Sequence, residues 1–250
     1  ELALTIVRKK FKTYLFDINK EKVRNLKKNI SPIKTINKKD ISTLNKNNIF
    51  DLENLSKIKE CDVIIVCLPT PLKNNLNPDM SYLIKCLRQI KKFLRQNQLI
   101  ILESTVYPGA TNEIIINSLK KRFRIGKNFF VAYSPEREDP GNKTFSSKNV
   151  TKLVSGQSKY CLELVRELYS KVFKNIWSMK NIETCEMTKL YENIYRSVNI
   201  GMVNEMKILC NKMNLNIYDI IKAAKTKPFG FHPFYPGPGL GGHCIPIDPL

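Results

Sequence analysis

The sequence predicts an α/β fold in which a doubly wound parallel sheet is followed by a long-helix domain. Three observations favour this class. Short apolar runs alternate with amphipathic stretches from about residue 11 to 180. A helical pattern with one glycine and no proline then continues over 181–213. The longest apolar runs, such as VIIVCL at 63–68, are far too short to cross a bilayer, so no membrane association is expected.

Each apolar run has the length of a strand and ends in turn-forming residues. Strands are expected at 13–18, 63–69, 99–104, 129–134 and 150–156. Helices are expected at 1–10, 20–28, 81–95, 111–122, 158–172 and 216–225, in addition to the long one. Ligands of open α/β sheets bind beyond the carboxyl ends of the strands, so we expect the loops PTP, TVYPG and PERED to face one crevice.

The change of pattern near residue 180 predicts two domains. A Rossmann-like domain is expected over 1–180, and a central helical domain that ends in a cysteine-containing loop is expected over 181–250. Long helices in this position commonly link domains or form a dimer core. We therefore expect a homodimer or a higher homo-oligomer.

Asp17 lies at the end of the first expected strand. A Rossmann half uses an acidic residue at the tip of its second strand to bind the adenosine ribose of NAD, although strand-end aspartates are also ordinary turn residues. The glycine fingerprint should lie about 20 residues earlier, yet the first glycine of the chain is Gly109. We therefore expect that the chain begins just after the first strand and the phosphate-binding loop.

The run GPGLGGHCIPID at 237–248 places a lone cysteine between a glycine-rich turn and an acid. Its glycines permit a close approach to the backbone and its prolines stiffen the loop. Cys244 is therefore a candidate nucleophile, with Asp248 four residues later; the alternative is that Cys244 is a small buried hydrophobe. His243 has no second Cys or His at ligand spacing, so no metal is expected.

The formal net charge of +20 raises the question of an anionic partner. The basic residues are spread over the whole chain without interleaved aromatic side chains, so the sequence does not favour nucleic-acid binding. An anionic small-molecule substrate fits the charge equally well. The seven cysteines form no CxxC pair, which predicts reduced thiols and a cytoplasmic location.

Six stretches together resemble the UDP-glucose/GDP-mannose dehydrogenase family. They follow the order of the family and span nearly the whole chain: FDINKEKV (16–23), VIIVCLPTP (63–71), ESTVYPGAT (103–111), YSPERED (133–139), ETCEMTKLYENIYRSVNI (183–200) and PFGFHPFYPGPGLGGHCIPIDP (228–249). The last stretch is most similar to enzymes that act on UDP-N-acetylhexosamines. The family's GxGYVG loop and its C-terminal nucleotide-sugar domain are not found, so the resemblance implies a fragment of such an enzyme.

The resemblance implies NAD as cofactor, a UDP-sugar as substrate and a role in polysaccharide biosynthesis. The expected reaction oxidises the C6 alcohol of UDP-N-acetylglucosamine to the uronic acid in two steps, through a thiohemiacetal and a thioester on Cys244. UDP-glucose and UDP-N-acetylmannosamine are the alternative substrates. A non-catalytic fragment that binds a sugar nucleotide or nucleic acid is the alternative function.

The resemblance also assigns catalytic roles. Lys189 is expected to stabilise the developing alkoxide or oxyanion, and Asn193, four residues later on the same helix face, is expected to hold a water or a substrate oxygen. Glu136 and Asp248 are the candidate bases for thioester hydrolysis, and Thr105 is expected to place the water. Without the resemblance, Lys189 would be interpreted as a surface lysine and Glu136 as a turn residue.

The resemblance assigns binding roles to residues in the loops. NAD is expected to contact Asp17, Pro69, Thr70 and Thr105. The sugar nucleotide is expected to contact Phe234, Tyr235, Gly237, Gly239 and Gly241. The two aromatic side chains could equally serve core packing.

Overall fold

The computed structural model of the chain describes residues 2–31, 36–50, 55–74, 76–137 and 150–241. The chain divides into two compact units. The first comprises Glu1–Thr70 and Met80–Glu186, and the second comprises Pro71–Asp79 and Met187–Leu250.

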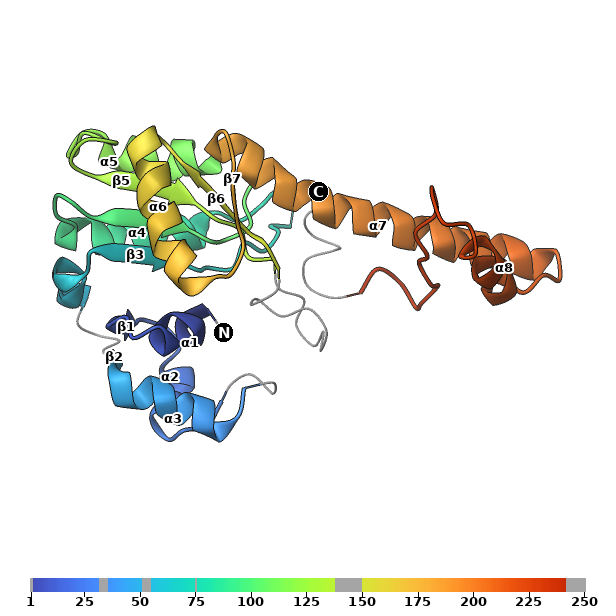
Figure 1. Ribbon diagram of the computed structural model, residues 1–250, viewed down its shortest axis with the longest axis horizontal. Helices are drawn as coiled ribbons and strands as arrows, with labels where there is room; N and C mark the ends of the chain where they lie inside the picture. Colours follow the sequence, from blue (N-terminus) through green and yellow to red (C-terminus); the bar gives the residue numbers. More distant parts are fainter. Residues whose placement is uncertain (1, 32–35, 51–54, 75, 138–149, 242–250) are drawn as a thin grey trace. The chain divides into compact units, whose positions relative to one another are not determined.

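Strands and helices are interspersed along the chain up to the end of the last strand (Figure 1). In order, they are α1 (Leu2–Arg8), β1 (Thr13–Leu15), α2 (Lys20–Lys27), α3 (Lys38–Asn47), β2 (Asn48–Phe50), the 3-10 helix η1 (Leu55–Glu60), β3 (Val63–Val66), α4 (Ser81–Ile90), the 3-10 helix η2 (Lys91–Phe93), β4 (Leu99–Leu102), the π-helix η3 (Thr111–Ile116), α5 (Asn117–Leu119), β5 (Phe130–Tyr133), β6 (Lys152–Gly156), α6 (Lys159–Val172), β7 (Ile176–Ser178), α7 (Ile182–Lys212) and α8 (Ile217–Ala224).

The main sheet has five strands in the order β3-β4-β5-β6-β7, and β1 and β2 form a separate parallel pair. The strands β3, β4 and β5 are parallel, and so are β6 and β7. β6 departs from the expected arrangement because it runs antiparallel to β5. A parallel pair needs a crossover connection, usually a helix, whereas an antiparallel pair does not. Among the described residues, the first helix after β5 is α6, which follows β6.

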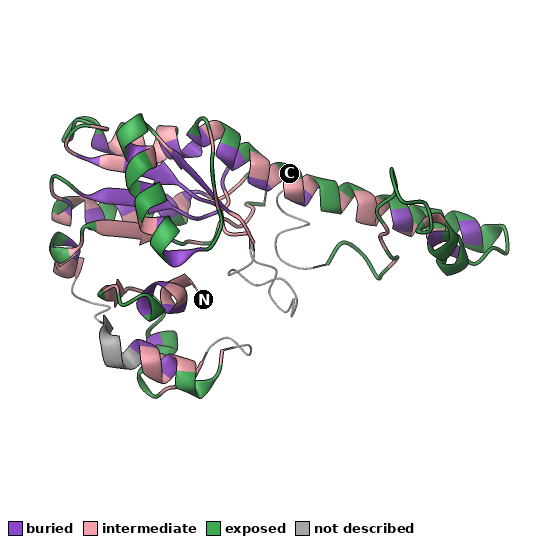
Figure 2. Ribbon diagram, viewed as in Figure 1, coloured by how far each residue is buried: buried purple, intermediate pink, exposed green. Residues whose placement is uncertain are grey.

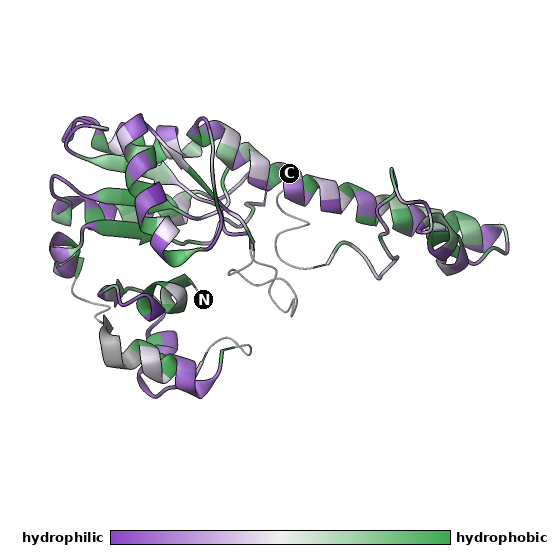
Figure 3. Ribbon diagram, in the orientation of Figure 1, coloured by the Kyte–Doolittle hydropathy of each residue, from purple (hydrophilic) through white to green (hydrophobic). Residues whose placement is uncertain are grey.

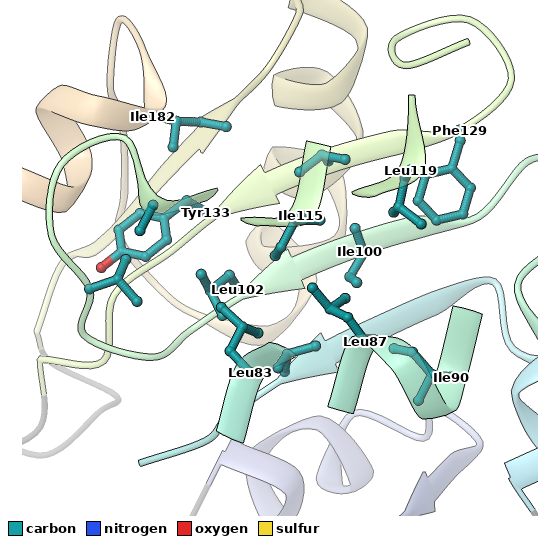
Figure 4. Packing of buried hydrophobic residues seen from close by; sticks show 14 of the residues in the cluster. Leu83, Leu87, Ile90, Ile100, Leu102, Ile115, Leu119, Phe129, Tyr133 and Ile182 are labelled. Atoms are coloured by element: carbon teal, nitrogen blue, oxygen red, sulfur yellow. The ribbon is translucent and has the colours of Figure 1, made fainter. Parts of the chain in front are cut away.

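Both faces of the main sheet are covered, which confirms the doubly wound α/β class. Successive residues of a strand point to opposite faces. On one face, Ile100 and Leu102 of β4 pack against Leu83 and Leu87 of α4 (Figure 4). On the other face, Leu99 and Ile101 belong to a second cluster that includes Val165 and Tyr169 of α6. The central strands β4, β5 and β6 are accordingly mostly buried, and β4 and β5 are rich in apolar side chains (Figures 2 and 3).

Four elements were not anticipated by the sequence pattern: α3, β2, η1 and β7. β1 is also shorter than the expected strand at 13–18, because side chains after Leu15 bond to the backbone. The amide of Asn19 donates to Asp17 Oδ1 at 2.8 Å, and Asn19 caps the start of α2. Such local bonds compete with the pairing of a strand.

Gly156 allows the end of β6 to approach the start of α6 closely. A Cβ at this position would lie 2.2 Å from the amide nitrogen of Leu162. We expect Gly156→Ala to lower the free energy of unfolding by about 1–3 kcal/mol, since the backbone has to shift. The matched control is Gly201→Ala in α7, where a Cβ meets no atom within 4 Å and an alanine favours the helix. Denaturant titration of both variants measures the difference, and an unchanged Gly156→Ala variant would contradict the expectation.

The second unit consists mainly of α7, α8 and the loop that follows them. Its buried cluster contains Val203, Cys210, Ile217 and Ile221, against which Phe234 packs. Within the described part of the chain, no helix combines the length and the apolar character that a membrane span requires.

Candidate active site

The carboxyl ends of β3, β4 and β5 lie side by side at one edge of the main sheet, as the sequence predicted. Their last residues are in register, with Val66 paired to Leu102 and Leu102 paired to Tyr133. The loops that follow are also linked, because the amide of Leu68 donates to Ser104 Oγ at 2.9 Å. This edge carries predicted site residues of the first unit from three strand-end loops.

The predicted residues at this edge are partly accessible. Thr70 and Thr105 are half-buried, Pro69 is exposed, and Glu136 has a side chain that is 44% exposed. Asp17, which follows β1, is also exposed. Polar groups here are accessible to a ligand, in contrast to the apolar side chains of the strands themselves.

Beneath this edge lies a buried ionic cluster that the sequence analysis missed. Lys152, the first residue of β6, forms an ion pair with Glu103, and their side chains are 4% and 2% exposed. The hydroxyl of Tyr169 donates a hydrogen bond to Glu103. Lys152 Nζ also donates to the carbonyl oxygen of Pro135 at 3.2 Å and lies 3.7 Å from Glu136 Oε2. One buried ammonium group therefore joins the loops after β4 and β5.

Glu186, in the second turn of α7, binds the loop after β4. The carboxylate is fully buried and accepts three hydrogen bonds: from the amide of Gly109 at 2.6 Å, from the amide of Thr111 at 3.0 Å and from Thr111 Oγ1 at 2.6 Å. Burial raises the pKa of Glu186, whereas the bonds from Thr111 and Gly109 oppose that rise. Glu183 adds a second link because Asn112 donates to it. The first turns of α7 are thus fixed to the start of η3.

We expect Glu186→Ala to lower the free energy of unfolding by about 3 kcal/mol, because it leaves buried donors of Gly109 and Thr111 without an acceptor. Glu186→Gln retains an oxygen acceptor and is expected to cost less. Glu205→Ala, an exposed position on the same helix, is the control and is expected to change the free energy by about 0.5 kcal/mol or less. Equal melting temperatures for the alanine variants at 186 and 205 would contradict this expectation.

Lys189 and Asn193 follow Glu186 at the spacing that keeps all three side chains on one face of α7. Lys189 is 8% exposed and Asn193 is fully buried. Arg196 donates a hydrogen bond to Asn193 Oδ1. The interpretation of Lys189 as an ordinary surface lysine is therefore wrong.

The loop after α8 carries the predicted substrate residues. Phe234 forms edge contacts with Tyr195, with ring centroids 5.9 Å apart, and packs on the cluster of the second unit. Tyr235 is 55% exposed. The amide of Gly237 donates to Asn204 Oδ1 at 2.9 Å, which ties the loop to α7. Gly239 and Gly241 are exposed and have positive φ angles of 159° and 65°. Cys244 and Asp248 lie outside the described residues.

Of the missed residues Glu103, Lys152 and Glu186, it is Lys152 whose place in the sequence gave a signal. Lys152 stands in an otherwise strand-like run, VTKLVSG, in a sheet that we expected to be covered on both faces. A charged residue in such a strand requires a buried partner. The sequence could have raised that question, but it could not identify the partner.

The fold and the strand-end loops define an α/β protein of the kind that binds a dinucleotide beyond the carboxyl ends of its strands. Residues 2–173 match the NAD binding domain of the UDP-glucose/GDP-mannose dehydrogenase family, and residues 183–250 match the central domain of the same family. The chain belongs to this family.

The similar proteins include proteins named as UDP-sugar dehydrogenases. The chain is 37% identical over 243 residues to Protein CapL from Staphylococcus aureus, covering 96% of this chain and 56% of that protein. It is 36% identical over 238 residues to UDP-N-acetyl-D-glucosamine 6-dehydrogenase from Pseudomonas aeruginosa, covering 94% of this chain and 55% of that enzyme. The structure of the UDP-D-ManNAc dehydrogenase from Pyrococcus horikoshii superposes with a TM-score of 0.87 at 31% identity, covering 99% of this chain and 59% of that one. The chain thus spans little more than half the length of these relatives.

The residues of the first unit fit the cofactor that its domain family binds. Three parallel strands end side by side, and their accessible loops carry hydroxyl groups and backbone polar groups. Asp17 supplies an exposed carboxylate of the kind that binds a ribose. These polar groups fit NAD, which binds beyond the carboxyl ends of parallel strands.

Proposed function

We propose that the protein oxidises the C6 alcohol of a UDP-N-acetylhexosamine, with UDP-N-acetylglucosamine as the preferred substrate, to the uronic acid. Two NAD molecules are reduced and one water is consumed for each sugar. The observation that carries the proposal is the buried pair Lys189 and Asn193 on one face of α7, within the stretch matched to the central domain of the family. A buried lysine of this kind supplies a positive charge where an oxyanion develops.

The proposed chemistry assigns each residue a step. NAD, when bound, accepts the hydrides, and Asp17, Pro69, Thr70 and Thr105 form its site. During the first oxidation the C6 hydroxyl releases its proton to solvent water and its hydride to NAD, and Lys189 stabilises the oxygen that loses the proton. The thiolate of Cys244 then adds to the aldehyde carbon, so that the second oxidation leaves a thioester.

Hydrolysis completes the proposed cycle. Thr105 holds a water, and Glu136 or Asp248 accepts its proton while the water oxygen bonds to the acyl carbon. The C–S bond breaks and Cys244 regains its thiolate. Asn193 orients a water or a substrate oxygen, and the loop containing Phe234, Tyr235, Gly237, Gly239 and Gly241 binds the sugar nucleotide.

UDP-N-acetylmannosamine is the second candidate substrate. It is favoured by the structural similarity to the UDP-D-ManNAc dehydrogenase from Pyrococcus horikoshii. The two sugars differ only in the configuration at C2. Discrimination between them therefore depends on contacts to the acetamido group.

The experiment that tests the function is a steady-state assay of the full-length protein with NAD and a panel of UDP-sugars. We expect the highest kcat/KM with UDP-N-acetylglucosamine and a yield of two NADH per sugar. A higher kcat/KM with UDP-N-acetylmannosamine or UDP-glucose would identify that sugar as the preferred substrate instead. Binding of a UDP-sugar or a nucleic acid without NADH formation from any sugar would contradict the enzymatic function.

We also propose that the protein forms a homodimer through α7, in the cytoplasm and without a membrane or nucleic-acid partner. An exposed apolar stripe runs along this helix with three- and four-residue spacing: Tyr191, Tyr195, Val198, Met202, Met206 and Leu209. An apolar stripe of this length calls for a covering partner. The elongated helix with its exposed turns is visible in Figure 2.

Light scattering of the full-length protein is expected to give at least the mass of a dimer. Met202→Glu, in the middle of the stripe, is expected to shift the mass toward the monomer because it places a charge in the interface. The control Lys212→Glu lies near the end of the helix and outside the stripe. A monomeric mass for the unmodified protein would contradict the proposed dimer.

A further inference from the structure

The packing of the core does not require the buried ionic cluster beneath the strand-end loops. Lys152 and Glu103 are almost completely removed from water. Replacing such a pair by apolar residues of similar size often leaves stability unchanged or raises it. Stability alone is therefore a weak reason for this sheet to contain an ion pair.

The cluster extends from the core to the candidate base. Its inner end is formed by Glu103, which also accepts a hydrogen bond from Tyr169. The rings of Tyr169 and Phe173 lie 5.7 Å and 5.4 Å from Lys152 Nζ and leave the ammonium little freedom on that side. Its outer end is Glu136, whose carboxylate is 3.7 Å from the same nitrogen and partly exposed. The ammonium thus connects a fixed buried carboxylate to an accessible one.

The backbone around Glu136 is held by the same strand. Lys152 Nζ donates to the carbonyl oxygen of Pro135, the residue before Glu136. Arg137, the residue after it, donates through Nη1 to the carbonyl oxygen of Thr151 at 2.8 Å. Both neighbours of Glu136 are therefore anchored at the start of β6.

The charge state of Lys152 agrees with this geometry. Burial by itself lowers the pKa of the lysine, but the carboxylates of Glu103 and Glu136 outweigh that effect, so the pKa is raised and the ammonium form persists.

We propose that Lys152 is a positioning residue, which Glu103 and Tyr169 hold in place so that it in turn holds the carboxylate of Glu136 where thioester hydrolysis requires a base. This inference rests on the proposed function. In the hydrolytic step, the water oxygen bonds to the acyl carbon, the water proton passes to Glu136, and the C–S bond breaks to return the thiolate to Cys244. Lys152 touches neither the water nor the acyl group. A misplacement of Glu136 by about 1 Å is expected to slow this step by about 10²-fold.

The test uses the full-length protein and a pair of substitutions that keeps the core neutral. Glu103→Gln combined with Lys152→Met removes both buried charges, so that neither is left without a partner. We expect this variant to retain its melting temperature, to lose about 10²-fold in kcat, and to accumulate an acyl-enzyme on Cys244 that intact-protein mass spectrometry detects. Lys171→Met is the control, because this exposed lysine pairs with Glu167 on the surface of α6 and is expected to keep the kcat of the unmodified enzyme.

A double-mutant cycle separates positioning from a general loss of structure. If Lys152 acts through Glu136, the factor by which Glu136→Gln lowers kcat is at least ten times smaller in the Glu103→Gln/Lys152→Met variant, the neutral-core variant, than in the unmodified enzyme. Equal costs in the two backgrounds, or a neutral-core variant whose kcat stays within twofold of the unmodified enzyme, would overturn the proposal. Loss of kcat without accumulation of the acyl-enzyme would overturn it as well.

Two further outcomes are distinguished by the same measurements. If the neutral-core variant does not fold, Lys152→Gln provides the same comparison, since its amide still donates to Glu103 but carries no charge. An unmodified enzyme that reduces no NAD with any UDP-sugar contradicts the proposed function itself. If the unmodified enzyme is active and Glu136→Gln accumulates the acyl-enzyme, but neither Lys152 variant does, only the proposed role of Lys152 is contradicted.

Discussion

Replacing Cys244 with alanine in the full-length protein is expected to abolish uronic acid formation, with a fall in kcat of roughly 10³-fold or more. The physical reason is that the second oxidation needs a tetrahedral adduct from which a hydride can leave, and the thiolate forms that adduct with the aldehyde. Without the sulfur, the aldehyde is released after one oxidation. The measurements are the NADH yield per sugar and the product analysed by mass spectrometry.

The control for this variant is Cys86→Ala, which alters a half-buried cysteine on α4. It is expected to retain two NADH per sugar and a normal rate. A Cys244→Ala variant that also yields two NADH per sugar at an unchanged rate would exclude the covalent route.

Replacing Lys189 with methionine is expected to lower kcat by about 10²- to 10³-fold with little change in KM. Methionine preserves most of the apolar packing of the side chain but removes the charge that stabilises the developing oxyanion. Because the lysine is 8% exposed, its charge acts in surroundings where water screens little. Steady-state kinetics with the preferred UDP-sugar measure the effect.

Lys212→Met is the matched control for Lys189, because it removes a lysine from the exposed end of the same helix. Its kcat is expected to equal that of the unmodified enzyme. A Lys189→Met variant that folds normally and keeps its kcat within threefold would show that the ammonium does not act on the reacting oxygen.

The sequence predicted most of the strands and helices because their periodicity is a local property. The apolar runs that contain β3, β4, β5 and β6 were located to within a few residues. α3 was missed because KKDISTLNKN carries few apolar residues. The edge strand β7 was missed because IWS is short and largely exposed. The direction of β6 was not predictable either, because it depends on the path of the chain and not on the strand's own residues.

The candidate site was predicted unevenly for a similar reason. The motifs identified Thr105 and Glu136 in strand-end loops, and the structure places both loops at the same edge. The motif around Lys189 gave its position on α7 but not its burial. Cys244 and Asp248 rest on the sequence resemblance alone, since the structure describes residues only up to 241.

By itself, the sequence determined the α/β class, the family and the order of the site motifs, because each of these depends on patterns of residues that lie a few positions apart. The tertiary structure alone decided which charged groups meet. Glu103 and Lys152 are 49 residues apart, and Gly109 and Glu186 are 77 residues apart. A buried charge has to find a partner of opposite sign or several hydrogen-bond donors. Which distant residue supplies them depends on how the strands and helices pack, and no local pattern encodes that choice.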